Sequence, residues 1–511
     1  MSDSREYRLC TPGMWAAMAV AVVGRVAFLA DKPLWRDEAW VALIAADPLA
    51  AAADGRAAPL GFLFLTRLVA GLGLGPPEVS YRLLPLLCGL ALLPLLAMWA
   101  RALGASHRVA LAAVWIAAGL QPFVYYSREL KSYDIDLLLA VLAPLLGMAG
   151  FGGAAPRAGA RWAFLACVCI APWVSFGGIF AVGALLAWGW LVWLPRADAG
   201  ARLAWIAASA GFLTSFAAVY ALALGNQASD PWMQAYWQYH LKADRALPLP
   251  RQLAVAAWQY VDASTAYLVP VGRAAVLAVA VLGAWRWPPP GRALLLFCYV
   301  GTAAVCVAAA VMDRYLLAHG RHLLFAAPVL VLWFANGLSQ IGRLLGPRLG
   351  PALVLGLPMA LSLSWTWDSV EHRLGSYRTS ATHFFRLDML HDVDAAIVEA
   401  KKLMRPDEPL LVSRRSAYAF QFYNQGRIRG ATYCDRHCNA FRGITLKWLK
   451  GLDKAGWVMM SDEDAAWFLD LLVRAGFRHE PQGSARGVKL WKVEREPRSR
   501  RAAAAAAATG L

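Results

Sequence analysis

The feature that most constrains this chain is a succession of apolar runs, each about as long as a membrane is thick. A helix needs roughly 20 apolar residues to cross the hydrocarbon core of a bilayer. A break at Ser175-Phe176-Gly177-Gly178 divides one longer apolar stretch into two spans. The sequence therefore predicts an all-α polytopic membrane protein with eleven spans, at residues 13–30, 81–103, 107–124, 133–150, 161–176, 178–195, 202–224, 267–286, 292–311, 321–341 and 351–367.

The composition supports this prediction and excludes other classes of protein. Hydrophobic residues make up 59% of the 511 residues and charged residues only 16%, whereas a soluble domain is closer to half apolar and a quarter charged. The net charge of +17 is spread over the membrane part and the remainder, without a single basic tail. Basic cytoplasmic loops and affinity for anionic lipid groups both explain such a charge. We expect membrane lipid, and no nucleic acid, among the partners.

One apolar stretch, residues 59–74, is short for a span and contains Arg67. If it lies on the membrane surface, the N-terminus and every later short loop on its side of the membrane are basic, and the positive-inside rule makes that side the cytoplasm. If it crossed, all later loops would face the other way. We therefore predict an interfacial helix at 59–74 and place the residues after Trp367 outside the cytoplasm.

The chain after Trp367 differs in character from the membrane part. It has amphipathic helical patterns at 391–404 and 464–476 and strand-like runs at 409–413 and 488–493, typical of a small α/β domain. Cys434 and Cys438 suit a local disulfide in an oxidising compartment, and whether they form one is left open. The predicted division is a transmembrane domain at 1–367, whose external first loop at 31–80 carries surface helices, an external α/β domain at 368–496 and a disordered tail at 497–511.

Two adjacent acids, Asp37 and Glu38, follow the first predicted span. A carboxylate at the membrane surface can take a proton from an acceptor hydroxyl while a lipid substrate stays in the bilayer. The alternative is an ordinary helix N-terminus, where acidic side chains suit the helix dipole.

Basic residues gather on the face predicted to be external, where the positive-inside rule predicts few. Arg128 and Lys131 lie three apart at the outer end of a span, where they can hold a lipid phosphate. Asp134 and Asp136 begin the next span, where acids are costly unless they are paired or face a cavity. The alternative is snorkelling of the basic side chains with a local Arg128–Asp134 pair.

Further residues on the same face are candidates for substrate contacts, while Arg25 within the first span is expected to snorkel toward the surface. An anionic group bound at this face would explain why these residues accumulate there. The candidates are Arg82, Tyr133, Asp134, Arg314, His319, Arg321 and His322. The alternative for any single basic one of them is a membrane anchor.

The order of these features resembles the GT-C superfamily of polytopic glycosyltransferases. The likeness is to bacterial relatives of the dolichyl-phosphate-mannose protein mannosyltransferases and of the aminoarabinose transferase that acts on lipid A. Where the family often has His-Pro-Pro-Leu, this chain has Ala57-Ala58 before Pro59, so acceptor contacts do not carry over from that segment. The matching segments are Asp37-Glu38, Ala58-Pro59-Leu60-Gly61, Ser80-Tyr81-Arg82-Leu83-Leu84-Pro85, Tyr126-Ser127-Arg128-Glu129-Leu130-Lys131-Ser132-Tyr133 and Gly320-Arg321-His322-Leu323-Leu324-Phe325-Ala326-Ala327-Pro328.

The resemblance implies transfer of a sugar from a polyprenyl-phosphate carrier to an acceptor glycan, lipid or protein, on the outer side of the bacterial cytoplasmic (inner) membrane. The family's base maps onto Asp37, with Glu38 as a supporting carboxylate. The donor phosphate maps onto Arg128, Lys131 and Arg321. Direct attack by a base-activated hydroxyl would invert the anomeric centre. No cofactor or metal ligand is implied, and the metal requirement stays open.

The alternative function is a transporter or flippase for a lipid-linked anion, which basic residues on one face also suit. Such a protein should show two related halves or polar broken helices near mid-membrane. Apart from the break at Gly177-Gly178, the sequence has neither. It does not identify the sugar, the acceptor or the carrier length.

Reporter fusions after Gly200 and after Gly375 test the topology. A reporter that is active only outside the cytoplasm should be silent after Gly200 and active after Gly375. The same location for both fusions would contradict the arrangement of eleven spans.

Overall fold

The computed structural model describes residues 11–27, 29–30, 33–55, 58–152, 157–231, 233–235, 247–265, 273–315, 317, 320–371, 392–413, 415–429, 431–432, 441–452, 455–485 and 487–496. The contacts divide the chain into two compact units. Met1–Leu29 with Asp47–Ser376 form one, called here the helical unit, and Ala30–Ala46 with Tyr377–Leu511 form the other, called the sheet unit. His319, Cys434, Cys438 and the tail at 497–511 lie outside the described residues.

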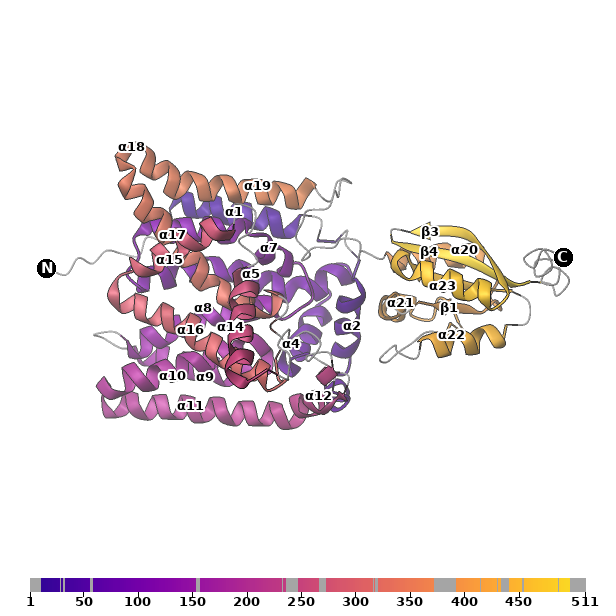
Figure 1. Cartoon of the computed structure of the whole chain (residues 1–511), viewed down its shortest axis with the longest axis horizontal. Coiled ribbons are helices and arrows are strands. Elements are labelled where there is room, and N and C mark those ends of the chain that lie inside the picture. The colour runs from indigo at the N-terminus through magenta and orange to yellow at the C-terminus, as the bar shows by residue number, and fades with distance from the viewer. Residues whose placement is uncertain are drawn as a thin grey trace. The chain divides into compact units, whose positions relative to one another are not determined.

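The helical unit consists of helices, with α11 and α19 at opposite borders in Figure 1. Its described α-helices are α1 Pro12–Val26, α3 Pro48–Ala53, α4 Leu60–Gly71, α5 Pro77–Ala102, α6 His107–Gly119, α7 Gln121–Tyr126, α8 Tyr133–Phe151, α9 Ala158–Val174, α10 Phe176–Trp188, α11 Ala199–Val219, α12 Gly225–Ser229, α14 Leu249–Thr265, α15 Arg273–Trp285, α16 Pro289–Val311, α17 Ala327–Leu344, α18 Gly346–Pro351 and α19 Leu357–Glu371. Short 3₁₀ or π-helical segments adjoin several of them. The π-helical segments are η1 Gly189–Trp193, η3 Tyr220–Leu224 and η6 Ala352–Gly356, and the 3₁₀ segments are η2 Leu194–Arg196 and η5 Gly320–Ala326.

All eleven predicted spans coincide with apolar helices. Four of them correspond to the shorter helices α1, α6, α9 and α15. In the described part of the chain, seven helical stretches are long and apolar enough to cross a membrane: Pro77–Ala102, Tyr133–Phe151, Phe176–Arg196, Ala199–Ser229, Gly291–Val311, Gly320–Leu344 and Gly346–Trp367. The chain is thus a multi-pass helical membrane protein with an additional small α/β domain, as predicted.

The stretch at 59–74 forms a short helix, α4. It has 12 residues, which at about 1.5 Å per residue span roughly 18 Å. The hydrocarbon core of a bilayer is roughly 30 Å thick. The length of α4 therefore agrees with an interfacial helix, whose position on the membrane surface stays a prediction.

The predicted break near Ser175 is a helix boundary with its own hydrogen bonds. α9 ends at Val174, and Ser175 adopts an extended conformation (φ −153°, ψ 127°) as the N-cap of α10. Its hydroxyl oxygen accepts from the backbone N–H of Gly178, one of the donors that a first helical turn leaves free. The same hydroxyl donates to the carboxylate of Asp136. One side chain therefore starts α10 and links it to α8.

Glycines allow the helices to approach closely. A Cβ on Gly283 of α15 would lie 1.7 Å from the backbone oxygen of Trp333 on α17. A Cβ on Gly337 of α17 would lie 2.0 Å from the backbone oxygen of Val279. The side-chain amide of Asn336 donates to the carbonyl oxygen of Gly283 at 2.8 Å. Small residues and interhelical hydrogen bonds are what hold helices together in lipid, where the hydrophobic effect between them is weak.

The sheet unit combines one four-stranded sheet with helices. The strands lie in the order β1-β2-β4-β3, with β1 and β2 parallel and the other pairs antiparallel. The two helices and two strands predicted after Trp367 are confirmed as α20, α23, β1 and β4. The elements are α2 Arg36–Ala45, α20 Val393–Leu403, α21 Ala417–Asn424, α22 Phe441–Lys450, α23 Asp462–Arg474, β1 Leu410–Val412, β2 Ala455–Ser461, β3 Phe477–Ala485 and β4 Val488–Arg495.

The nearly buried carboxylate of Glu408 fixes the segment just before β1. Glu408 accepts hydrogen bonds from the indole N–H of Trp457 on β2, at 2.8 Å, and from the backbone N–H of Arg405, at 2.9 Å. Burial by itself would raise the pKa of Glu408, but these donors, together with the charge of Arg405, hold that pKa below its usual range. The carboxylate therefore stays ionised at neutral pH and ties the segment before β1 to the next strand.

The helix α2 packs with the sheet unit, although the sequence analysis assigned the whole first loop to the membrane domain. It contacts α21, and the backbone N–H of Leu34, just before α2, donates to the hydroxyl oxygen of Tyr423 at 2.6 Å. These partners are separated by 389 residues. Asp37 and Glu38 therefore stand on a helix that the C-terminal part of the chain holds.

Tyr423→Phe should loosen the start of α2, because the N–H of Leu34 loses its acceptor. One neutral hydrogen bond contributes about 1 kcal/mol, so amide exchange around Leu34 should rise about fivefold. Hydrogen–deuterium exchange of the full-length protein measures this. The control is Tyr220→Phe, which changes an exposed ring in the helical unit. Unchanged exchange at 33–38 in Tyr423→Phe would show that this bond does not hold α2.

Candidate functional site

The first turn of α8 and the turn η5 bring three of the predicted residues together. The ring of Tyr133 contacts the ring of Tyr126 (centroids 4.8 Å apart) and that of His322 (5.9 Å). Nε of Arg321 lies 3.4 Å from Nε2 of His322, and Tyr126 is close enough to Arg321 to experience its charge. Tyr133, Arg321 and His322 therefore form one aromatic and cationic cluster with Tyr126, called here the mouth cluster.

Arg314, between α16 and η5, donates to the backbone oxygen of Ala228 at 2.9 Å. Three other predicted basic residues lie in the connection between α7 and α8 and in α5. Arg128 donates from Nη1 to the backbone oxygen of Gly24 at 3.3 Å, which ties this connection to α1. Lys131 is half-buried in the same connection, and its backbone N–H bonds the backbone oxygen of Glu129 at 2.7 Å. Arg82 is fully buried and donates to the backbone oxygen of Leu29 at 3.1 Å. Roles of these three side chains in phosphate or substrate binding stay predictions.

Arg25 does not snorkel, contrary to the expectation from its position in the first span. Its side chain is fully buried, and Nε donates to the hydroxyl of Ser127 at 3.1 Å. Nη1 and Nη2 donate to the backbone oxygens of Ala118 (2.7 Å) and Ala117 (3.2 Å). These carbonyls belong to the last turn of α6, where the helix itself leaves acceptors free and the dipole favours a cation. Arg25 thus caps α6 and fixes the residue that precedes Arg128.

Asp134 is also fully buried, and its neighbours are Ser127 and Arg25 rather than the Arg128 of the alternative sequence interpretation. Arg25 and Glu129 are the charged groups that act on it. A Cβ on Gly89 of α5 would lie 2.1 Å from the hydroxyl oxygen of Ser127 and 2.5 Å from Oδ2 of Asp134. A larger residue at position 89 would therefore clash with Ser127 and Asp134, and glycine lets α5 pack directly against these two side chains. Sequence reasoning missed the partnership, although a basic residue in one apolar span and an acid in another were its signal.

The second acid of α8, Asp136, is 3% exposed and accepts from the hydroxyl of Ser175. A Cβ on Gly177 would lie 2.7 Å from Oδ2 of Asp136 and 2.5 Å from the ring of Phe325 in η5. The cost of placing this acid in the bundle is thus offset by a hydroxyl donor and by close packing of α8, α10 and η5.

The acid pair Asp37-Glu38 occupies the first turn of α2. Glu38 is fully buried, and its Oε2 accepts from the backbone N–H of Trp35 at 3.3 Å. The alternative sequence interpretation, a solvated helix N-terminus, predicted this position in the helix but not the burial of Glu38. Asp37 is partly exposed and pairs with Nε of Arg36 at 3.2 Å. Of the two acids, Asp37 therefore has the side chain that solvent and an acceptor can reach, and its catalytic role stays a prediction.

Across the described ranges, no three His, Cys, Asp or Glu side chains are grouped so that they could hold a metal ion. The metal requirement therefore stays open.

Most of the chain shares its fold with known membrane glycosyltransferases. ArnT from Cupriavidus metallidurans bound to undecaprenyl phosphate superposes with a TM-score of 0.55 at 12% identity, over 94% of this chain and 98% of that one. Its apo state gives a TM-score of 0.57 at 12% identity, over 94% and 97% of the two chains. The sequence matches no family model and no curated protein.

The archaeal oligosaccharyltransferase AglB from Archaeoglobus fulgidus, in complex with an inhibitory peptide and a dolichol-phosphate, also superposes on the chain. Its TM-score is 0.51 at 11% identity, over 90% of this chain and 70% of AglB. ArnT and AglB both belong to the GT-C superfamily. The likeness establishes a GT-C fold, as the short motifs predicted.

Arg25→Met should destabilise the helical unit, because the last turn of α6 and Ser127 lose their donor and the buried Asp134 loses a neighbouring positive charge. A buried acceptor left without its donor costs about 1–3 kcal/mol. Arg25→Lys should recover only part of the loss, since one ammonium cannot replace the several directed donors of a guanidinium. Thermal unfolding of the detergent-purified protein measures both effects.

Arg251→Met, at an exposed arginine of α14, is the control and should change stability by less than about 0.5 kcal/mol. The double variant Arg25→Met with Asp134→Leu should be more stable than Arg25→Met alone. An Arg25→Met protein as stable as the wild type would show that the guanidinium of Arg25 does not stabilise this part of the helical unit.

Proposed function

From the GT-C fold of this chain, we propose that it is a membrane glycosyltransferase that moves a sugar from a polyprenyl-phosphate carrier to an acceptor hydroxyl on a glycan, lipid or protein. Reaction takes place at the outer face of the cytoplasmic membrane. The observation that supports this most is a GT-C-like fold over 94% of the chain, with the mouth cluster at the start of α8. ArnT bound to undecaprenyl phosphate and AglB with a dolichol-phosphate suggest the class of carrier.

The proposed reaction needs a base for the acceptor hydroxyl and a binding site for the leaving phosphate. Asp37 takes the proton of the acceptor hydroxyl, and Glu38, which caps α2, keeps that helix turn in place. The hydroxyl oxygen then bonds the anomeric carbon as the bond to the carrier phosphate breaks, which inverts the anomeric centre. A polyprenyl phosphate leaves as an anion, so cationic donors rather than a general acid lower the barrier.

Arg128, Lys131 and Arg321 are the proposed donors to that phosphate. Arg128 and Lys131 belong to the connection that Arg25 and Ser127 hold in place, and Arg321 belongs to the mouth cluster. Guanidinium groups suit phosphate because they offer two parallel N–H donors. Tyr133 and His322 of the mouth cluster present ring edges and polar atoms on which the sugar can lie.

Asp37→Asn should abolish most sugar transfer without affecting folding or insertion, because it preserves shape and removes basicity. A general base contributes about 10²–10⁴-fold to the rate. Turnover of purified protein with radiolabelled polyprenyl-phosphate sugars measures this. The matched control is Asp54→Asn, at an exposed acid of the same loop, which should keep full turnover. An Asp37→Asn protein with more than about a third of wild-type turnover would exclude Asp37 as the base.

Arg128→Ala and Lys131→Ala should each lower turnover about 10²-fold, the effect of removing one donor to a developing anion. Arg67→Ala removes an exposed arginine from α4 and is the control for charge alone. Donor affinity and turnover are measured separately on the same preparations. Wild-type values of both in Arg128→Ala and Lys131→Ala would place the phosphate elsewhere.

A further inference from the structure

A cavity of about 240 Å³ lies at the end of the helical unit opposite the mouth cluster. Arg82 and Tyr133 stand near the beginnings of α5 and α8, whereas Leu103 and Met148 of the cavity wall lie at or near their ends. α8 has 19 residues, roughly 28 Å of helix, close to the roughly 30 Å thickness of the hydrocarbon core. The cavity therefore lies near the other membrane face, the one predicted to be cytoplasmic.

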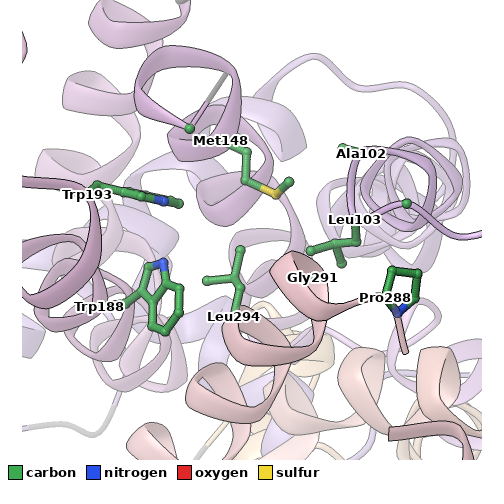
Figure 2. A pocket seen from close by; sticks show the side chains of 10 residues that line it. Ala102, Leu103, Met148, Trp188, Trp193, Pro288, Gly291 and Leu294 are labelled. Carbon is green, nitrogen blue, oxygen red and sulfur yellow. The ribbon is translucent and has the colours of Figure 1, made fainter. Parts of the chain in front are cut away.

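Apolar side chains from four parts of the helical unit surround this space. Figure 2 shows Leu103 and Met148 with two indole rings, Trp188 and Trp193, and Leu294 of α16 around it. The indole N–H of Trp287 donates to the backbone oxygen of Leu103 at 3.1 Å. This bond holds the start of α16 against the end of α5, so the wall is a fixed part of the fold.

A π-helical turn brings the two tryptophans to one side. In a regular α-helix, residues five apart point roughly 140° away from each other. Between Trp188 and Trp193 the chain instead forms the π turn η1, closed by the N–H of Leu194 on the oxygen of Gly189, and this wider turn aligns positions five apart. A Cβ on Gly189 would lie 1.8 Å from the ring of Trp205. Single π turns are uncommon and concentrate at functional sites.

The wall suits a hydrocarbon chain. Apolar cavities of about 150 Å³ take a benzene molecule, so this one has room for a segment of acyl chain. It is smaller than the roughly 300–1,000 Å³ of sites for whole small molecules. Its apolar lining suits the methylene groups of such a segment.

Arginines adjoin the lining residues in sequence. Arg101 directly precedes the lining residue Ala102, and Arg292, which is exposed, directly follows the lining residue Gly291. The acid Asp198, predicted on the same membrane face, is paired with Arg161 at 3.8 Å. The charge at this end of the unit therefore complements a phosphate that carries a net negative charge.

We propose that this cavity binds one acyl chain of an anionic phospholipid from the cytoplasmic leaflet. The chain lies between Met148, Leu294 and the two indoles. The lipid phosphate lies by Arg101 and Arg292. Such a lipid would join the ends of α5, α8 and α10 to the start of α16. This proposal does not depend on the function proposed above.

Lipid titration of the delipidated full-length protein in detergent, followed by native mass spectrometry, tests the proposal. Phosphatidylglycerol and phosphatidylcholine with identical chains are compared. Leu294→Trp fills the cavity, and its matched control, Leu296→Trp, changes a side chain of the same helix that is 51% exposed. Arg292→Gln removes one charge, and Arg251→Gln, at an exposed arginine of α14 away from the cavity wall, is its control.

The wild type and Leu296→Trp should retain one phosphatidylglycerol in preference to phosphatidylcholine, and Leu294→Trp should lose it. Arg292→Gln should lower phosphatidylglycerol affinity about fivefold, the effect of one basic residue near an anionic surface, and Arg251→Gln should not. If Leu294→Trp does not fold, the arginine pair decides. Equal retention by the two tryptophan variants, equal affinity for the two lipids, or preferential displacement of phosphatidylglycerol by a polyprenyl phosphate would each overturn the proposal.

Discussion

The candidate site depends on one buried guanidinium, that of Arg25. A bilayer offers no water to the carbonyls that remain free where α6 ends, so their donor must come from the protein. Arg25 donates to the last turn of α6 and to Ser127, and its charge offsets the cost of burying Asp134 beside it. The connection that carries Arg128 and Lys131 begins at Ser127. Its position is therefore a consequence of how this cation is satisfied.

The base and the phosphate-binding residues of the proposed reaction stand on parts of the chain that are stabilised in different ways. The basic residues belong to the connection between α7 and α8 and to the turn η5, both within the helical unit. Asp37 belongs to α2, which packs against α21 and is joined to Tyr423 by a hydrogen bond.

Local patterns predicted most of the elements, because a membrane span needs a long apolar run and helices and strands each place apolar residues at a regular spacing. The apolar runs became apolar helices, and Ser175 marked a real helix boundary because its side chain can replace a backbone acceptor. In the C-terminal domain, β2 and β3 were missed for opposite reasons. β2 is buried along nearly its whole length and lacks alternation, whereas β3 is largely exposed, polar and interrupted by Pro481 and Gly483.

The site shows the same division. Sequence alone determined which residues stand at the ends of the spans, because hydropathy and helix length are local properties: Tyr133, Arg321 and His322 were named from such positions. Only the tertiary structure decided which of them meet, that Arg25 points inward to Ser127 and Asp134, and that α2 lies with α21. A buried charged group is stable only beside groups that hydrogen-bond it or carry the opposite charge. Those groups lie on other helices or in distant parts of the chain, so a short stretch of sequence does not contain both partners.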